Sequence, residues 1–153
     1  MSFMNRKFCL LLFFVFLGIF GTITNVSGQS IPPWVRDAWE TTEDVLVGVG
    51  SAKLNNSQNS MNFAEFNAKM GIARQIVDTI AIPDRFWNEN DAGAVTLELE
   101  FVAQELTFEF GNELRIVRRS TESDGTSWCV VSLNRAGIEK YHDMGVNFIQ
   151  TMF

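Results

Sequence analysis

The chain has 153 residues, with 12 Lys and Arg against 18 Asp and Glu, and a formal net charge of −6. This excess of acid disfavours nucleic acid and anionic lipid as main partners, because both require a positive protein surface. The length suits one domain with a hydrophobic core of its own.

The first residues differ in composition from the rest of the chain. Two basic residues precede an apolar run, Phe8 to Phe20, which gives way to small and polar residues up to Val26-Ser27-Gly28. This is the order of a secretory signal peptide, so we expect residues 1–28 to be removed on export and residues 29–153 to form a single α+β domain. An uncleaved membrane anchor is the alternative, but the apolar run is shorter than the roughly 20 residues that a spanning helix needs.

Removal of this leader changes the charge and the cysteine content. Arg6 and Lys7 leave with it, so the remaining chain carries 10 basic and 18 acidic residues, a net charge of −8. Cys9 lies at the start of the apolar run, whereas a lipoprotein signal places its cysteine at the end. Cys129 would then be the one remaining thiol, so we expect no internal disulfide. Because the apolar run leaves with the leader, we expect no transmembrane segment after cleavage.

Three segments before residue 83 carry structural signals. The two prolines in Ile31 to Val35 favour an extended segment whose last residues tuck against the domain. Val45 to Ala52 is rich in β-branched residues and predicts a buried strand. Residues 59–81 predict a helix that ends before Pro83.

The predicted helix carries a wide apolar stripe, because its large side chains recur at spacings of three and four. The stripe consists of Phe63, Phe66, Met70, Ala73, Val77 and Ile80, flanked by Ala68, Ile72 and Ile76. A stripe of this width indicates a helix that lies across a sheet.

Residues 84–94 are polar and rich in turn formers, and the segment after them is ambiguous. Leu97, Leu99 and Phe101 alternate with acids, as do the apolar residues of 106–110, which favours a strand with a bulge near 102–105. Leu97, Phe101 and Phe108 also share one helical face, so a helix stays open.

The last third of the chain predicts a hairpin and a helix. Asp124-Gly125 lies between two β-rich runs, 113–120 and 126–133, which is a strong hairpin signal. Within it, Leu114 and Ile116 are expected on one face, and Arg115, Val117 and Arg119 on the other. Asn134 to Ala136 opens a terminal helix. The fold predicted is therefore α+β, with an antiparallel sheet of three to four strands packed by one long helix, and a C-terminal helix.

No constellation of residues indicates catalysis, a cofactor or a metal. His142, the one histidine, lacks a nucleophile motif and favours a surface position, and Cys129 favours the core. The alternating glutamates favour a solvated face, and Gly48-Val49-Gly50 lacks the third glycine of a dinucleotide site. The arginines at 115, 118 and 119 are expected to pair with glutamates of a neighbouring strand.

Several motifs together resemble a known family. They are Pro33-Trp34-Val35 after a leader, a strand ending Gly48-Val49-Gly50-Ser51-Ala52, a helix with Ile72-Ala73-Arg74-Gln75-Ile76, and the hairpin strand that follows Asp124-Gly125. This order resembles the Lpp-twenty-type bacterial envelope lipoproteins and the amino-terminal domain of the flagellar T-ring protein FlgT. The resemblance implies one helix across an antiparallel sheet, a periplasmic or cell-envelope setting and no enzymatic residues. The chain departs from the lipoproteins in lacking a lipobox cysteine.

The sequence thus favours a non-catalytic exported interaction or assembly module with a protein partner in the cell envelope. Trp34, Trp39, Phe86 and Trp87 are its candidate contact residues, since large exposed aromatics mark contact surfaces. The alternative is a carrier of a small apolar ligand, with a pocket between helix and sheet near Phe101, Phe108 and Phe110.

Overall fold

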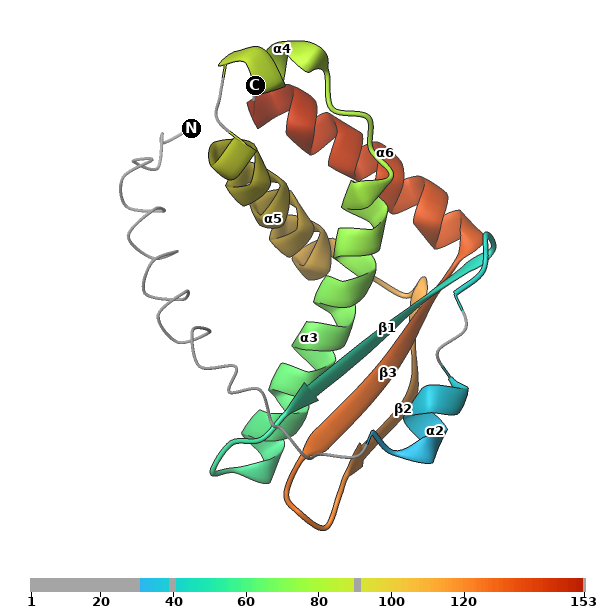
Figure 1. Ribbon diagram of the computed structural model, residues 1–153. Coiled ribbons are helices and arrows are strands. Elements are labelled where there is room, and N and C mark those ends of the chain that lie inside the picture. The colour runs from blue at the N-terminus through green and yellow to red at the C-terminus, as the bar shows by residue number, and fades with distance from the viewer. Residues whose placement is uncertain (1–30, 39–40, 90–91, 153) are drawn as a thin grey trace. The chain divides into compact units, whose positions relative to one another are not determined.

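Three antiparallel strands form one sheet in the order β1-β3-β2 (Figure 1). The computed structural model describes residues 31–38, 41–89 and 92–152. The strands are β1 (Val45–Ala52), β2 (Leu114–Thr121) and β3 (Ser127–Asn134). β3 is central, and it pairs along its whole length with β1 and from Ser127 to Leu133 with β2. The predicted strand at 45–52 and the predicted hairpin are confirmed.

Helices cover both faces of this sheet. The helices of the described part are α2 (Pro33–Asp37), α3 (Ser57–Asp78), α4 (Asp84–Glu89), α5 (Ala92–Glu109) and α6 (Arg135–Met152). The long α3 crosses one face, while Val35 of α2 is buried against Val47 and Val130 on the other (Figure 1). α5 and α6 pack against α3 and against each other. The predicted α+β architecture, with one long helix over an antiparallel sheet and a C-terminal helix, is confirmed.

Small residues bring α3 into direct contact with β1. A Cβ atom on Gly50 would lie 2.0 Å from the carbonyl oxygen of Ala64, and one on Gly48 would lie 2.1 Å from that of Ala68. Both alanines are fully buried. The two glycines of the strand therefore serve close backbone packing, as glycine often does where two backbones approach.

The larger side chains of the α3 stripe contact the other helices, which corrects the expected orientation. Thr107 of α5 lies 3.1 Å from the sulfur of Met70, and the Phe66 ring lies 6.1 Å from the ring of Phe108. Ile80 packs against Gly145 of α6. The stripe is wide because α3 has two neighbours, the sheet, which Ala64, Ala68 and Ile72 contact, and the helices α5 and α6, which Phe66, Met70 and Ile80 contact.

Two segments expected to be extended are helical. Pro33 to Val35 belong to α2, because Pro33 occupies the first turn of the helix, where its missing N–H costs nothing, and Pro32 precedes it as the N-cap residue. The expected strand within 96–110 is wrong, since the segment forms most of α5. The turn-rich stretch that precedes it contains α4.

A bulge in β2 changes the faces predicted for the hairpin. Ile116 pairs with Val131 and Arg118 with Val130, so Val117 is the extra residue. Leu114 and Ile116 share a face, with Arg115 opposite, as predicted. After the bulge, the residues of β2 that share a face change from even-numbered to odd-numbered positions. Arg119 therefore lies on the same face as Leu114, and its predicted position on the opposite face is wrong.

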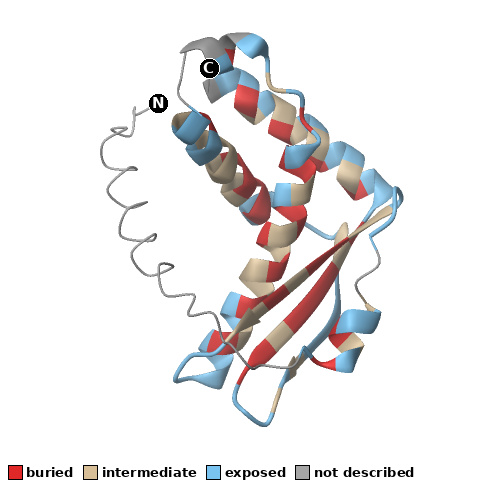
Figure 2. Cartoon of the chain, viewed as in Figure 1, coloured by how far each residue is buried: buried red, intermediate tan, exposed pale blue. Residues whose placement is uncertain are grey.

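The C-terminal helix begins at a capped turn. The side-chain oxygen of Asn134 accepts a hydrogen bond of 2.9 Å from the N–H of Gly137. Tyr141 and Ile149 are buried in the main core, together with α3 and α5 residues. Figure 2 shows the buried residues concentrated where α3, α5, α6 and the sheet meet.

Candidate functional site

The four aromatic residues predicted as contacts do not form one surface. Trp34 on α2 is half-buried: the Arg118 guanidinium lies 4.5 Å from its ring centroid, and its indole nitrogen lies 3.5 Å from Glu122 Oε1. Trp39 lies outside the described residues. Trp87 on α4 is 46% exposed and keeps its place as a candidate.

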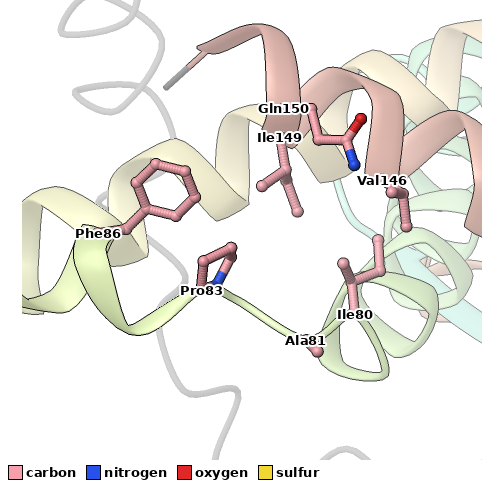
Figure 3. Close-up of a pocket in the computed structure, with 7 residues that line it drawn as sticks. All are labelled: Ile80, Ala81, Pro83, Phe86, Val146, Ile149 and Gln150. Carbon is pink, nitrogen blue, oxygen red and sulfur yellow. The ribbon is translucent and has the colours of Figure 1, made fainter.

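Phe86 is a correction to that set, because it is only 2% exposed. The ring faces a space between α4 and α6, and Ile149 faces it from the other side (Figure 3). The polar stretch around Phe86 suggested a surface position, but α4 turns this ring inward and its neighbour Trp87 outward. Adjacent residues of a helix point about 100° apart, so consecutive positions can place one ring in the core and the next on the surface.

Among the described helices, the two large apolar side chains with the highest exposed fractions both lie on α5. Leu97 is 51% exposed and Phe108 is 66% exposed. They are eleven residues apart, so after three turns their side chains project within about 20° of each other. Phe101 is half-buried and lies about 40° from Leu97 on the same side. We name Leu97, Phe101 and Phe108 the α5 apolar face.

The opposite side of α5 is also apolar, but it belongs to the core. Its buried residues include Val95, Val102, Ala103 and Leu106. Leu106 lies close to 180° around the helix from Leu97. Figure 2 shows buried and exposed residues on this one helix. A helix that is apolar on two opposite sides has one side that its own domain leaves uncovered.

Acidic residues line one side of the α5 apolar face. Glu98, Glu105 and Glu109 recur at spacings of seven and four, about 100° around the helix from Leu97. Within the described part of the chain none of the three forms an ion pair, unlike Glu100 on the other side, which binds Arg74 of α3. The face therefore has an uncompensated negative border.

Contacts with α3 and α6 hold α5 in place. The Nε atom of Arg74 lies 3.1 Å and 3.0 Å from the two carboxylate oxygens of Glu100. This hydrogen bond and the charge of Glu100 raise the pKa of Arg74. The Thr107 hydroxyl donates to the Ala103 carbonyl at 2.9 Å, beside Met70. The outward direction of Leu97 and Phe108 is thus fixed by contacts on the other side of the helix.

A hydrogen-bond network around Tyr141 fixes the end of α5. The Gly111 N–H donates to the Tyr141 hydroxyl at 2.8 Å, and that hydroxyl lies 3.1 Å from the Glu109 carbonyl and 2.9 Å from Glu113 Oε2. Lys140 donates to Glu113 Oε1 at 2.7 Å. The Lys140 hydrogen bond, a backbone hydrogen bond and the Tyr141 hydroxyl lower the pKa of Glu113 to about 2.

A pocket lies between the helices rather than between helix and sheet. Its volume is about 360 Å³, and it is lined by Ile80, Ala81, Pro83, Phe86, Val146, Ile149 and Gln150 (Figure 3). The position expected for a ligand is therefore corrected. α3 and β1 pack too closely at Gly48 and Gly50 to leave space there. Phe101, Phe108 and Phe110 do not line this pocket.

The reactive side chains are separated. Cys129 on β3 is fully buried, as predicted, and burial raises the pKa of its thiol to about 11. His142 lies on α6, with its Nδ1 atom 3.7 Å from Asp143. In residues 31–38, 41–89 and 92–152, no group of three or more His, Cys, Asp or Glu is arranged to hold a metal ion.

None of the helices described has both the length and the apolar composition needed to cross a membrane. In comparisons with known proteins, no family model, no curated protein and no solved structure matches the chain.

The α5 apolar face was not among the residues predicted as contacts. Its signal was present, because Leu97, Phe101 and Phe108 share a helical face in the sequence. The alternation with acids favoured a strand instead. In a regular strand, Leu97 and Phe101 would share one face and Phe108 would lie on the other.

Proposed function

We propose that the chain is a non-catalytic, exported interaction or assembly module that binds a protein partner through the α5 apolar face. The observation that carries this proposal is the exposure of Leu97 and Phe108, at 51% and 66%, on one side of a helix whose other side is buried. Large exposed apolar side chains that share one side of a helix are typical of contact surfaces.

The shape of the face favours a helix as the partner element. Leu97 and Phe108 span about 16 Å along the α5 axis, the length of three helical turns. Phe66 of α3 contacts the Phe108 ring and extends the face sideways. A row of apolar residues at helical spacing on the partner would pack against this surface.

The acidic border selects the charge of that partner. In an antiparallel symmetric pair of α5 helices, Glu98, Glu105 and Glu109 of the two copies would lie on the same side of the interface and come close to one another, which disfavours this mode of self-association. A partner helix with Lys or Arg beside its apolar row would neutralise the same border. We therefore infer an apolar helix with basic flanks in another protein.

Export and the envelope setting rest on the sequence. The leader at 1–28 supports export, and the resemblance to Lpp-twenty-type envelope lipoproteins supports a periplasmic or cell-envelope location. The positions of Cys129 and His142, on different elements with one of them buried, support a role without catalysis.

Site-specific photo-cross-linking in the producing cells tests the partner proposal. A photoreactive phenylalanine at position 97 or 108 is expected to form one discrete adduct, whose cross-linked peptide is an amphipathic segment with basic flanks. The matched control is position 147, an exposed asparagine on α6. An absence of adducts at 97 and 108, the same adduct at 147, or an adduct between two copies of this chain would contradict the proposal.

The pocket supports a second candidate function, the binding of a small apolar ligand. A volume of about 360 Å³ falls within the range of roughly 300 to 1,000 Å³ found for ligand pockets. The fluorescence of a neutral aromatic probe should increase when it binds in this pocket. The substitution Val146→Trp places a large ring in the pocket from α6, and it should abolish the fluorescence increase while leaving the fold intact. Equal fluorescence with the folded Val146→Trp protein would exclude this pocket as the binding site.

A further inference from the structure

The two outer edges of the sheet differ in how their backbone groups are satisfied. On β1, the Val47 N–H donates to Thr41 Oγ1 at 3.2 Å, and the Val47 carbonyl accepts from Gln75 Nε2 at 2.9 Å. The Ser51 carbonyl accepts from Asn67 Nδ2 at 3.0 Å. Side chains of α3 and of the loop before β1 thus occupy outward backbone groups at Val47 and Ser51, which obstructs the addition of another strand at this edge.

The β2 edge lacks such covering groups. The Glu122 N–H donates to the Thr126 carbonyl at 2.8 Å, and the alternation of an antiparallel pair then directs the backbone groups of Ser120 toward β3 and those of Arg119 and Ile116 outward. Within the described part of the chain, no hydrogen bond is made to the outward groups of Ile116 and Arg119. This edge is free to accept a strand.

Positive charge is concentrated on this edge, in a chain whose net charge is −6. Arg115 forms no ion pair within residues 31–38, 41–89 and 92–152. Arg118 stacks on Trp34, which leaves its charge in place, and Arg119 Nη1 lies 3.8 Å from Glu65 Oε2 at an exposed position. The expected pairing of the arginines with glutamates of a neighbouring strand is wrong, because Glu65 belongs to α3 and β3 has no glutamate.

The bulge at Val117 distributes the arginines over both faces of the sheet. Arg115 pairs with Ser132 and Arg118 with Val130, so both lie on the α2 side. Arg119 lies on the α3 side. Ile116 and Val117, which are 39% and 49% exposed, add apolar surface beside the charges.

From these observations we propose that the β2 edge binds an extended acidic segment of a partner protein as a fourth strand. Main-chain hydrogen bonds to Ile116 and Arg119 supply the pairing, and the arginines on both faces select acids at successive positions of the added strand. A second copy of the chain is not the occupant, because two β2 strands paired about a two-fold axis would bring their arginines together. This site is independent of the α5 apolar face.

Amide hydrogen exchange of the whole chain tests the proposal without a variant. The probe is a synthetic peptide of about eight residues that is rich in consecutive Glu and Val, and its Lys/Val counterpart is the control. With the acidic peptide, exchange at the outward amides of Ile116 and Arg119 is expected to slow at least about tenfold, while that of Arg118 and Ser120 stays unchanged.

The double variant Arg115→Glu, Arg118→Glu should lose this protection and gain it from the Lys/Val peptide instead. Absence of binding would show that the arginines only protect the edge against aggregation. Binding without slowed exchange at Ile116 and Arg119 would show surface charge attraction without strand addition. Either result overturns the proposal for the β2 edge and does not affect the proposal that the α5 apolar face binds a partner helix.

Discussion

At the scale of single residues, Gly48 and Gly50 set the distance between β1 and α3. A Cβ on Gly50 would lie 2.0 Å from the Ala64 carbonyl oxygen and 2.4 Å from the Ala68 nitrogen, both backbone atoms of a buried helix. The backbone of α3 would have to move to accept any side chain. The glycines were visible in the sequence as part of a strand, but their partner atoms on α3 were not.

Gly50→Ala is therefore expected to lower the free energy of unfolding by about 3 kcal/mol, the upper range for overpacking of a core. The matched control is Gly71→Ala in the middle of α3, where a Cβ would lie 3.8 Å from its nearest neighbour. That change should stabilise by about 0.5 to 1 kcal/mol, because alanine is the better helix former. Urea unfolding of both variants checks the pair, and equal effects would contradict the packing described.

Glu113 gives the protein a pH-dependent element. Its folded-state pKa of about 2 lies below the ordinary value of 4.5, since Lys140 and Tyr141 stabilise the carboxylate. Because the folded-state pKa is lowered, the ionised Glu113 carboxylate stabilises the fold above pH 4.5, and this contribution to the free energy of unfolding is lost as the pH falls toward 2. Glu113→Gln should thus reduce the loss of unfolding free energy between pH 5 and pH 2, measured by urea titration at a series of pH values. An identical slope in variant and parent would contradict this assignment.

At the scale of elements, α5 is the helix that the sequence pattern predicted wrongly as a strand. Alternation of apolar and acidic residues is the pattern of a half-buried strand, and it arose here because α5 is apolar on two opposite sides. Leu97 and Leu99 lie on opposite sides of the helix, so their spacing imitates a strand. The strand β1 and the hairpin were predictable because their β-branched residues and Asp-Gly turn act locally.

Two leucines of α5 provide a matched test of its two sides. Leu106→Ala is expected to cost about 3 kcal/mol of unfolding free energy, because the side chain is fully buried. Leu97→Ala should change it by less than about 0.5 kcal/mol, as at other exposed positions. Denaturant unfolding of the two variants measures both values. A large loss in Leu97→Ala would mean that the chain itself covers the α5 apolar face.

At the scale of the whole molecule, tertiary contacts determine which aromatic residues are buried and which are exposed, and the local sequence pattern did not predict this. Phe86 and Trp87 were equivalent candidates in the sequence, and only the packing of α4 against α6 distinguishes them. The export proposal belongs to this scale as well. The intact mass of the exported protein should correspond to residues 29–153, and a species that keeps Met1 would contradict removal of the leader.

The central claim is that Leu97 and Phe108 are free in the isolated protein and covered in the cell. Thiol labelling measures both states, using Leu97→Cys and Phe108→Cys, with Asn147→Cys as the exposed control. Buried Cys129, whose pKa is raised to about 11, contributes little background. We predict rapid labelling of all three variants after purification, and protection of positions 97 and 108 alone in intact cell envelopes. Equal labelling of the three positions in the envelope would contradict the claim.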